Sequence, residues 1–516
     1  MSTGELLLPS NFLKRPQSEL SASHPSIGNL VVELPELYFA ADYLLRQTGR
    51  KTLVEFGQSN GLKLSPIVTA AKKRLLLDTQ ENAIKASECR FEGELFEFDV
   101  ARATTKTLPK IDWHDTVIIC ANILENLDHP VDLLNCIKFI YDAGGLVLLS
   151  SPDRERMYGG IHLGPPEKMS RVREWTLHEL TSLFSSLDML PAFSGYTIDD
   201  NMRRNKNRCV FILDRGLDLN APALSENPLG IVSCFNDADI IEQLSLKHLD
   251  EGLDLYFLDN WSDDGTYQIL KRLQRKFGPR VQIERFPAFP TAEYEWRAIL
   301  SRKAAIGATF PGRWIIHVDS DELRTSPWQG VSLREGLATV SKYGSNAVEF
   351  AVIEHPPLDD KFNENLDPTV HFSHCYFSKH PSHFLQTKAW LQSDQIVDLA
   401  GSGGHHAEFQ GRKVFPYRFV LNHFPIRSTS HGLKKVLQDR KPRFSREEQS
   451  MGWHTHYDNV TDGFRFLSLP DIHIARQNDF LENYLLETIT DVVHKRMTGA
   501  LTARLTSHGR TPLQRC

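Results

Sequence analysis

The sequence predicts an α/β protein with two sheet-centred domains and a helical C-terminal extension. In both halves, short apolar strand-like runs alternate with helix-like runs, a pattern typical of parallel sheets wrapped by helices. A length of 516 residues exceeds one typical domain and suits two. We expect a loose leader at residues 1–28, a first domain at 29–214, a linker at 215–228, a second domain at 229–450 and a helical extension at 451–516.

Composition narrows the class of protein. The chain is 41% hydrophobic and 24% charged, which is ordinary for a soluble globular protein, and its net charge of -6 gives no reason to expect a nucleic-acid partner. Its seven cysteines are scattered without CxxC spacing, which favours a reducing, cytoplasmic location. No apolar run is long enough for a transmembrane helix. The basic C-terminal end predicts a solvated tail, with peripheral membrane contact as the alternative.

Strand-like segments of the first domain end in glycine or polar residues. The five segments span residues 51–57, 74–77, 96–99, 116–122 and 144–150. Glycines after the first segment let the backbone approach a ligand, followed by a helix from about residue 66. An acidic residue at the end of the second is placed to accept hydrogen bonds from ribose. Thr176 with Glu179 predicts a capped helix, and strands near 195–198 and 208–213 close the domain.

The order of these segments resembles a class I S-adenosylmethionine-dependent methyltransferase over residues 30–214. The segments at 121–130 and 171–180, together with His162, extend the resemblance beyond the glycine motif. The resemblance implies S-adenosylmethionine as the cofactor and a hydroxyl as the methylated group. It implies that the cofactor is held by Glu55, Gly57, Gly61, Asp78, Asp99 and Asn122.

Two residues depart from that family's pattern. Ser59 stands where the glycine motif usually has its middle glycine, and Asn126 stands where many relatives have a histidine. The second departure removes a common candidate base, for which His162 or His129 is the alternative. The first domain is therefore either an active methyltransferase or a folded scaffold that has lost catalysis.

An acidic pair closes an apolar strand in the second domain. Residues 313–319 are strand-like and lead into Asp319 and Asp321, and positions i and i+2 of a strand point to the same face. Two carboxylates held side by side repel unless positive charge lies between them. Their oxygens suit Mg²⁺ or Mn²⁺, so the pair predicts a divalent-cation site. The alternative is a strand that ends in a solvated acidic turn.

Neighbouring strands also end in polar side chains. Strands are expected at 229–236, 253–258 and 281–286, with helices at 239–248 and 267–277. In such sheets a ligand binds outside the carboxyl ends of the strands. Asn236, Asp259, Asn260, Asp319 and Asp321 all fall at those ends, so we expect them to share one edge.

Residues 229 to about 450 resemble a family 2-type glycosyltransferase with the GT-A fold. Segment 259–266 matches that family's Asp-Asn-x-Ser-x-Asp-x-Thr pattern with one additional residue before the threonine. The resemblance implies that Asp259 and Asn260, with Asn236 nearby, contact a nucleotide-sugar donor. It implies that Asp319 and Asp321 bind a metal, and that the sugar is transferred with inversion by direct displacement of a nucleoside diphosphate.

A later element, His423 to Ser428, matches a His-Tyr-Pro-x-Arg-Ser pattern of the same branch and precedes Lys434 and Lys435. By this likeness His423 is a further metal ligand; the alternative is a structural histidine. Arg427 suits either a phosphate clamp or an ion pair. His405 and His406 follow a glycine run, and we expect both to be structural. An inverting transfer needs a base, for which Asp394 and Glu408 are candidates.

Together these features predict a bifunctional glycan-modifying enzyme. Its partners would be a nucleotide-sugar donor and a glycan or lipid-linked glycan acceptor, and linkage of two activities raises the effective concentration of the shared glycan. Two alternatives stay open: a glycosyltransferase with a scaffolding first domain, and a non-catalytic carbohydrate-binding protein. In the C-terminal extension, residues 479–498 predict a helix with one apolar face.

Overall fold

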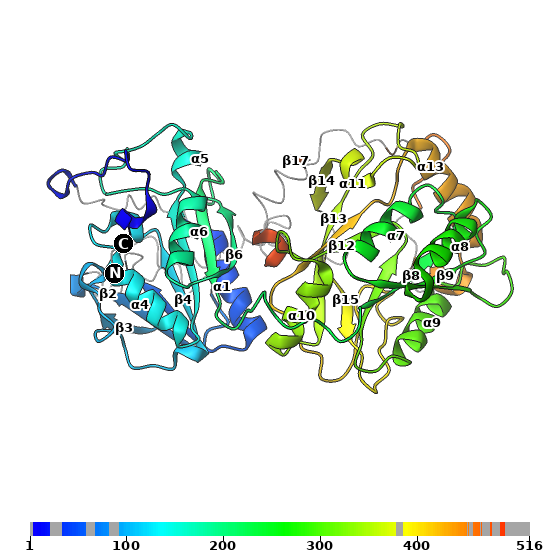
Figure 1. The fold of residues 1–516 in the computed structure, drawn as a ribbon, viewed down its shortest axis with the longest axis horizontal. Coiled ribbons are helices and arrows are strands. Elements are labelled where there is room, and N and C mark those ends of the chain that lie inside the picture. Colours follow the sequence, from blue (N-terminus) through cyan, green and yellow to red (C-terminus); the bar gives the residue numbers. More distant parts are fainter. Residues whose placement is uncertain are drawn as a thin grey trace. The chain divides into compact units, whose positions relative to one another are not determined.

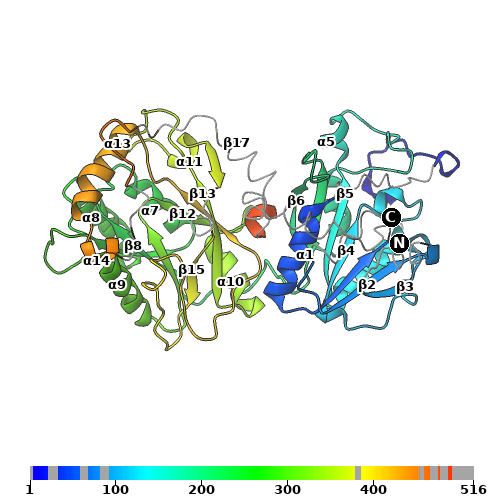
Figure 2. The ribbon, with the colours of Figure 1, turned by 180° about the vertical axis from the view of Figure 1, so that it is seen from behind.

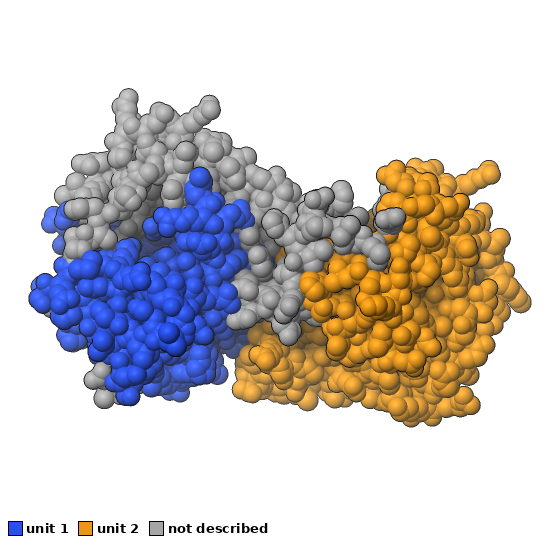
Figure 3. Space-filling view, turned by 90° about the horizontal axis from the view of Figure 1, so that it is seen from above, with its two compact units in different colours: residues 1–217, 481–516 blue, residues 218–480 orange. Residues whose placement is uncertain are grey.

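The computed structural model divides the chain into two compact units (Figures 1 and 3). Unit 1 comprises residues 1–217 and 481–516, and unit 2 comprises residues 218–480. The division falls inside the predicted linker. The structure describes residues 4–20, 33–57, 68–81, 92–377, 385–450, 453, 458–464, 466, 475–476 and 486–490.

Unit 1 is built on a seven-stranded sheet with the order β3-β2-β1-β4-β5-β7-β6. Strands β1 to β5 run parallel, and β7 pairs antiparallel with both β5 and β6. The strands are β1 (Thr52–Phe56), β2 (Lys73–Asp78), β3 (Glu94–Glu97), β4 (Thr116–Ala121), β5 (Leu146–Pro152), β6 (Pro191–Thr197) and β7 (Arg208–Leu213). All seven predicted strands are confirmed to within a few residues, except that β3 ends at Glu97, two residues before Asp99.

Helices cover both faces of this sheet. They are α1 (Pro35–Thr48), α4 (Val131–Asp142), α5 (Arg154–Tyr158) and α6 (Leu177–Ser186). Helices α4 and α6 lie in front in Figure 1, whereas α1 is in front in Figure 2. The main core packs α4 and α6 residues against alternate strand residues such as Val54 and Phe56. The predicted capping box is confirmed, because Thr176 and Glu179 exchange side-chain to backbone hydrogen bonds at the start of α6.

The described part of the predicted loose leader is packed rather than loose. Leu6, in the 3₁₀ turn η1 (Gly4–Leu7), is buried in the core, and its carbonyl accepts a hydrogen bond from the Trp175 indole at 3.1 Å. Arg15 N donates to Val172 O at 2.9 Å. Leu6 explains the anchoring, because the core buries its side chain and Leu8 packs partly against the same core.

Unit 2 begins with four parallel strands in the order β10-β9-β8-β11. They are β8 (Leu229–Cys234), β9 (Asp254–Asp259), β10 (Val281–Arg285) and β11 (Trp314–Asp319), connected by α7 (Ile241–Asp250), α8 (Thr266–Phe277) and α9 (Trp296–Ala308). Helix α9 packs Ile299 and Leu300 against Leu229 and Ile231 of β8. The predicted alternation of strands and helices is therefore confirmed for this half of the sheet.

The sheet then continues with antiparallel and mixed pairing. The further strands are β12 (Glu322–Thr325), β13 (Ala347–Glu354), β14 (His374–Phe377), β15 (Leu385–Leu391), β16 (Phe419–His423) and β17 (Ala475–Arg476). The helices are α10 (Leu333–Tyr343), α11 (Pro368–His371), α13 (Thr429–Leu433) and α14 (Arg446–Ser450), with the π-helix η7 (Lys434–Arg440) and the 3₁₀ turn η8 (Lys441–Arg443) after α13. Strand β15 lies beside β11, β16 pairs with both β12 and β13, and these pairings place the candidate site.

The predicted C-terminal extension is divided between the units. Residues 451–480 are grouped with unit 2, and residues 481–516 with unit 1. Residues 486–489 are helical, and Ile489 is buried. Lys206 connects this helix to the body of unit 1, with its Nζ 2.7 Å from Glu487 Oε1 and 3.0 Å from Glu36 Oε2. The rest of the helix predicted at 479–498 lies outside the described residues. In the part of the chain described, no helix has the length and apolarity needed to cross a bilayer.

Candidate functional sites

Unit 1 places its predicted cofactor residues along one edge of the sheet. Strands β3, β2, β1 and β4 are neighbours and run parallel, so their carboxyl ends meet. Gly57 and Asn122 follow β1 and β4, with φ of 55° and 53°, and Asp78 ends β2. The strand order reverses between the neighbouring strands β1 and β4. Doubly wound sheets bind their ligands at such a reversal point. Gly61 and Ser59 lie outside the described residues.

The side chains at this edge suit a nucleoside-bearing cofactor. Asp78 is buried and accepts a hydrogen bond from Thr79 N at 2.7 Å. Asp99 is 46% exposed and caps the turn after β3 by accepting from Ala101 N at 2.9 Å. Glu55 is buried and accepts a hydrogen bond from the Tyr38 hydroxyl. Two carboxylates beside a left-handed glycine match the chemistry of ribose and adenine recognition, so the described residues fit S-adenosylmethionine.

A buried charged cluster follows β4, and the sequence prediction missed it. Glu125 is 1% exposed, and burial raises its pKa to about 7 although Arg171 and Arg208 act in the opposite direction. Glu174 accepts a hydrogen bond from Arg171, and Met157 Sδ lies 3.7 Å from Arg171 Nη1. The signal in the sequence is Glu125, a charged residue that directly follows the apolar Ile123 and Leu124.

The alternative bases in unit 1 differ in their surroundings. His162 is half-buried and stacks on Tyr158 with ring centroids 4.7 Å apart. His129 is 83% exposed beside Asp128. Asn126 donates from Nδ2 to Asn122 O at 2.9 Å, so it supports the loop at the end of β4. His162 remains the better-placed of the two histidines, since a partly buried ring can lie against an acceptor.

In unit 2 the register of the parallel strands brings the predicted strand ends together. Ser233 pairs with Asp319 across β8 and β11, and Cys234 pairs with Asp259 across β8 and β9. Asn236 has φ of 57° and accepts a hydrogen bond from Asp263 N at 3.0 Å. The predicted common edge is thus present.

Two predicted nucleotide contacts are engaged by other side chains at this edge. Asp259 is fully buried, with Oδ2 3.3 Å from Arg285 Nε. Asn260 is buried too and accepts a hydrogen bond at 2.7 Å from Arg443 Nη2. Arg443 also lies over the Phe235 ring, 4.0 Å from its centroid. Arg285 and Arg443 therefore already engage these two residues within unit 2.

Lysines surround Asp319. Its Oδ2 lies 3.2 Å from Lys388 Nζ, and its Oδ1 accepts from Ser233 Oγ at 3.2 Å and lies 3.6 Å from Lys303 Nζ. Burial alone would raise the pKa of Asp319, but Lys388, His317 and Lys303 outweigh it and hold that pKa well below its usual value. Burial lowers the pKa of Lys303 to about 7. Asp319 is therefore ionised and neutralised from within the unit.

Asp321 has a different set of partners. Lys435 Nζ donates to its Oδ2 at 2.7 Å, and His423 Nε2 lies 3.7 Å from its Oδ1. Burial would raise the pKa of Asp321, but Lys435, His423 and Arg427 hold it below its usual value. Among the described residues no three His, Cys, Asp or Glu side chains form a metal-binding group, so the predicted set of Asp319, Asp321 and His423 is corrected. The reason is that β11 ends at Asp319, so Asp321 lies outside the strand. Positions i and i+2 share a face only within a strand.

His423 keeps one feature of a metal ligand. Its Nδ1 lies 3.0 Å from Glu354 Oε2, and the pairing of β16 between β13 and β12 sets Glu354, His423 and Glu322 in one row. A carboxylate on one ring nitrogen commonly orients the other nitrogen toward a metal. His423 Nε2 also lies 3.7 Å from Asp321 Oδ1, so the imidazole stands between two carboxylates, and no metal-binding group is found among the described residues. Glu354 and Asp321 raise the pKa of His423 to about 9 although burial lowers it.

Arg427 is an internal ion-pair residue. It is 1% exposed, with Nη2 2.7 Å from Asp239 Oδ1 and 3.3 Å from Asp237 Oδ1. Asp237 also accepts a hydrogen bond from Ser320 Oγ at 2.5 Å. Of the two interpretations of Arg427, the structure shows the ion pair. The pair is buried, and it connects the segment before α13 to the segment after β8.

The candidate bases of unit 2 lie apart from this network. Asp394 is exposed and follows β15, whose last residue Leu391 pairs with Trp314 at the start of β11, so Asp394 lies near the amino edge of that strand. Glu408 is 53% exposed and forms an ion pair with Arg412 at 2.9 Å. The base therefore stays a prediction, and the position of Asp394 at the amino edge argues against that residue. His406 Nδ1 lies 3.4 Å from Thr387 Oγ1, consistent with a structural role.

Lys303 and Lys388 are the site residues that sequence reasoning missed. Lys388 lies in the middle of β15 with buried neighbours on both sides, and Lys303 is fully buried in α9. A lysine inside an apolar strand or helix face is rarely buried unless it is paired with an acid, so each was a detectable signal.

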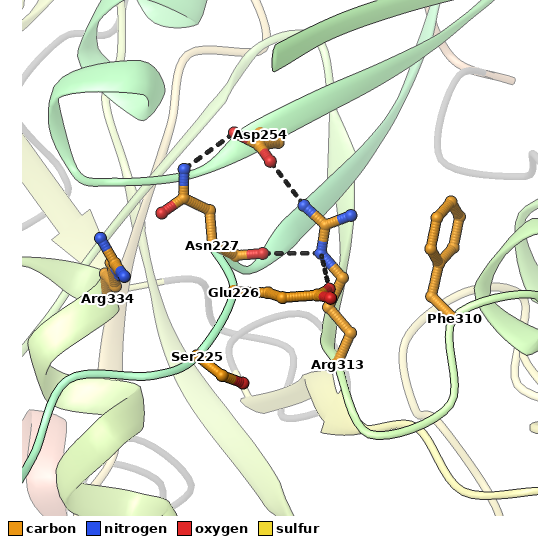
Figure 4. A pocket seen from close by; sticks show the side chains of 7 residues that line it. All are labelled: Ser225, Glu226, Asn227, Asp254, Phe310, Arg313 and Arg334. Atoms are coloured by element: carbon orange, nitrogen blue, oxygen red, sulfur yellow. Dashed lines mark hydrogen bonds and ion pairs between the residues drawn. The ribbon is translucent and has the colours of Figure 1, made fainter. Parts of the chain in front are cut away.

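A separate pocket of about 530 Å³ lies at the opposite, amino edge of the unit 2 sheet (Figure 4). Arg313 occupies its wall and is fully engaged there, donating to Asp254 Oδ2 and to Asn227 O, each at 2.6 Å. Figure 4 draws these contacts as dashed lines, together with those from Arg313 to Glu226 and from Asn227 to Asp254. The pocket is far in topology from Asp319 and Asp321, and Arg313 pairs with Asp254 inside it.

Of the comparisons with known proteins, only the one with solved structures found proteins that are similar to this chain. No family model and no curated protein matches the chain. An O-methyltransferase of neocarzinostatin biosynthesis, solved with S-adenosylmethionine, aligns with 18% identity over 34% of this chain and 51% of its own, TM-score 0.25. A Burkholderia thailandensis N1-methyltransferase solved with S-adenosylhomocysteine aligns with 15% identity over 35% of this chain and 77% of its own, TM-score 0.26. An Aquifex aeolicus S-adenosylmethionine-dependent methyltransferase aligns with 17% identity over 37% of this chain and 93% of its own, TM-score 0.25.

These neighbours are methyltransferases that align with about a third of this chain, and the chain spans about half the length of the first. At such TM-scores the likeness decides neither fold nor activity. The interpretation of unit 1 therefore rests on its strand order and on the residues at its carboxyl edge.

Proposed function

We propose that unit 1 is a methyltransferase that uses S-adenosylmethionine and methylates a hydroxyl group. The observation that carries this proposal is the shared carboxyl edge of β1 to β4, with Gly57, Asp78, Asp99 and Asn122 along it. The cofactor would supply the methyl group. Asp78 would bind the ribose of the cofactor, and Asp99 would bind its adenine. The acceptor would then lie at the neighbouring end of β4.

Cofactor binding by the full-length chain tests this proposal. Isothermal calorimetry with S-adenosylmethionine should show saturable binding that Gly57→Val abolishes, because a valine at φ 55° is strained and projects at the edge. Gly49→Val is the matched control: Gly49 has φ of 72°, lies before β1 at the other end of the strand and has open space around it. Equal binding by both variants would remove the assignment. No binding by the native chain would favour the scaffold alternative.

We propose a second function for unit 2, transfer of a sugar from a nucleotide-sugar donor with inversion. The observation that favours it is a concentration of charge near the carboxyl end of β11: the partly exposed Asp319, the buried Asp321 and the histidine oriented by Glu354. Mg²⁺ is typically bound by one or two carboxylates plus substrate phosphates, and Asp321 would supply one such carboxylate. A bound cation would neutralise the charge that grows on the departing diphosphate.

Donor hydrolysis, screened across nucleotide sugars with and without Mn²⁺, tests this second function. Asp321→Ala should abolish metal-dependent hydrolysis. Asp218→Ala is the control, because Asp218 pairs with Lys342 at the exposed surface of the same unit. Hydrolysis that persists in Asp321→Ala would show that Asp321 only holds the turn. If the chain binds neither S-adenosylmethionine nor any nucleotide sugar, the result would favour the alternative of a non-catalytic carbohydrate-binding protein.

If both activities hold, one chain would extend a glycan and methylate a hydroxyl on it. A glycan or a lipid-linked glycan would be the shared acceptor. Calorimetry with S-adenosylmethionine and with nucleotide sugar plus Mn²⁺ separates the bifunctional enzyme from a glycosyltransferase with a scaffolding first unit, since only the former binds both.

A further inference from the structure

Glu125 is a buried carboxyl group of unit 1 with one oxygen that no donor in the described part of the chain reaches. It lies in the 3₁₀ turn η5 (Leu124–Asn126) after β4, and it is 1% exposed. The unpartnered atom is Oε2. Buried polar atoms without a hydrogen bond are costly and rare in native proteins, and a catalytic role is one of their explanations.

Asp153 shows how a structural carboxylate at the same edge is held. It is fully buried after β5, and both of its oxygens have partners. Oδ1 accepts from Arg156 N at 2.8 Å, and Oδ2 accepts from Leu177 N at 2.8 Å and lies 3.2 Å from Cys209 Sγ. These contacts fix the starts of α5 and α6. Glu125 Oε2 holds no such element, so a structural role does not explain its burial.

Two neighbours of Glu125 also have atoms without partners in the described part of unit 1. Glu174 pairs with Arg171 through Oε1, whereas its buried Oε2 has no donor there. Arg208 Nε has no acceptor there. The guanidinium groups of Arg171 and Arg208 lie 3.7 and 3.4 Å from the same Met157 Sδ. Two acceptors and one donor therefore stay open, and a hydroxyl-bearing ligand can satisfy both kinds because a hydroxyl donates and accepts.

The backbone holds Glu125 beside the end of β4, where the proposed acceptor would lie. Its carbonyl oxygen accepts from Val172 N at 2.8 Å and from Arg173 N at 3.3 Å, so the segment before α6 lies against η5. Asn126, the next residue, donates from Nδ2 to Asn122 O at 2.9 Å. The carboxyl group is thus carried on a turn that is fixed on both sides and close in the chain to a proposed cofactor residue, an arrangement that keeps a reacting group in position.

We infer that Glu125 is the base of the methyl transfer that unit 1 is proposed to catalyse, and that its Oε2 accepts the hydroxyl proton of the acceptor. The inference rests on the proposed function of unit 1. In this step the acceptor O–H bond breaks, its proton moves to Glu125, and the oxygen forms a bond to the methyl carbon of S-adenosylmethionine. The bond from that carbon to sulfur breaks, its electron pair stays on sulfur, and S-adenosylhomocysteine leaves. Glu125 then releases the proton to solvent.

The surroundings of Glu125 suit this role near neutral pH. The titratable groups that face it are Lys168, Arg171 and Glu174 between α5 and α6, Arg208 on β7 and the Cys120 thiol on β4. Burial raises the pKa of Glu125 to about 7, although the charges of Arg171 and Arg208 act in the opposite direction. A general base works best when its pKa lies near the working pH, because it is then both ionised and basic.

Transfer of a labelled methyl group by the full-length chain tests the inference. The donor is tritiated S-adenosylmethionine, and the acceptors are the methyl glycosides of glucose, galactose, mannose and rhamnose. Glu125→Gln should lower the rate by about a hundredfold or more, since a positioned base contributes about 10²–10⁴-fold. Its affinity for S-adenosylmethionine, measured by calorimetry, should stay within about twofold of the native value. A loss of rate smaller than about tenfold would overturn the inference.

Two further variants identify the base. Glu155→Gln changes an exposed carboxyl group in α5 and should leave the rate of transfer unchanged. His162→Gln tests the imidazole alternative, and it should lower the rate less than Glu125→Gln does. The reverse order would overturn the inference in favour of His162.

The pH profile and the stability of the variant separate a base from a structural residue. The native rate should rise with pH and level off above about 7, because Glu125 accepts a proton only when it is ionised. A native rate that is flat between about pH 5.5 and about pH 8.5 would contradict the assignment. Glu125→Gln should lose activity while it unfolds less readily than the native chain at pH 8, which excludes misfolding as the cause.

Failure of the base and failure of the proposed function give different results. Transfer by the native chain that Glu125→Gln retains would refute the base alone. A native chain that transfers no methyl group to any of the four glycosides would count against the proposed function of unit 1, and with it against the inference.

Discussion

The two units treat buried charge at their carboxyl edges in opposite ways. In unit 2, burial raises the pKa of Asp319 and Asp321 less than neighbouring cations lower it, so both pKa values fall below their usual range. In unit 1, burial raises the pKa of Glu125 to about 7, and Arg171 and Arg208 only partly offset it. A carboxyl group at the same kind of edge is thus ionised in unit 2 and half-protonated near neutral pH in unit 1.

The difference follows from how each acid is partnered. Asp321 has the Lys435 ammonium at 2.7 Å, whereas Glu125 Oε2 is buried with no hydrogen-bond donor within reach among the described residues. A buried carboxylate without a close donor loses hydration and gains little in return. We therefore expect the charges of unit 2 to support its fold and the charge of Glu125 to weaken that of unit 1.

Arg427→Met should have the largest effect. Arg427 is fully buried between Asp237 and Asp239, and removal of one partner from a buried ion pair costs about 3–5 kcal/mol. Urea denaturation of the full-length chain should show this loss of unfolding free energy. Arg272→Met, which breaks an exposed pair with Glu242, is the control and should cost less than about 1 kcal/mol. Similar losses for both variants would break the comparison between the units.

Glu125→Gln should have a large effect that depends on pH. Because the folded state raises the pKa of Glu125 from 4.5 to about 7, this group stabilises the fold fully below pH 4.5, and that contribution is lost as the pH rises through about 7. Glutamine stays neutral, so the variant should match the native chain near pH 4.5 and exceed its unfolding free energy by about 3 kcal/mol at pH 8.

Urea denaturation at the two pH values measures this difference, with Glu97→Gln on the exposed edge strand as control. A gain for Glu125→Gln that is the same at both pH values would show that Glu125 does not titrate in this range.

Asp99→Asn should have a moderate effect confined to binding. The Asp99 side chain is 46% exposed, so its loss should change the unfolding free energy by less than about 0.5 kcal/mol. S-adenosylmethionine should bind about tenfold more weakly, or about 1.4 kcal/mol, if this carboxylate accepts hydrogen bonds from the cofactor. Calorimetry measures the affinity, and unchanged binding would remove Asp99 from the cofactor site.

Lys342→Met should have the smallest effect. Lys342 and Asp218 form an exposed ion pair in unit 2, and such pairs contribute about 0–1 kcal/mol. Added salt should reduce even that difference. A larger loss in urea denaturation would mean that exposed pairs also hold unit 2 together, which would blur the contrast with the buried pairs around Asp319 and Asp321.

Local patterns were enough to predict strands β1 to β11 and most of the residues that end them, whereas β12 to β17 were not predicted. Runs of apolar side chains with polar termini located β1 to β11 closely, because side-chain alternation and helix capping act over a few residues. The Thr176 and Glu179 capping box shows how far such local rules reach. The anchoring of Leu6 was missed because it depends on Trp175, which is 169 residues away.

The sequence by itself determined which polar residues stand at strand ends, since that depends on where each apolar run stops. Only the tertiary structure decided their partners. Asp319 meets Lys388 because β15 lies beside β11, and His423 meets Glu354 because β16 lies between β12 and β13. Those pairings join segments about 70 residues apart, and whether a buried acid is bridged by a cation or by an ammonium depends on which strand the sheet places next to it.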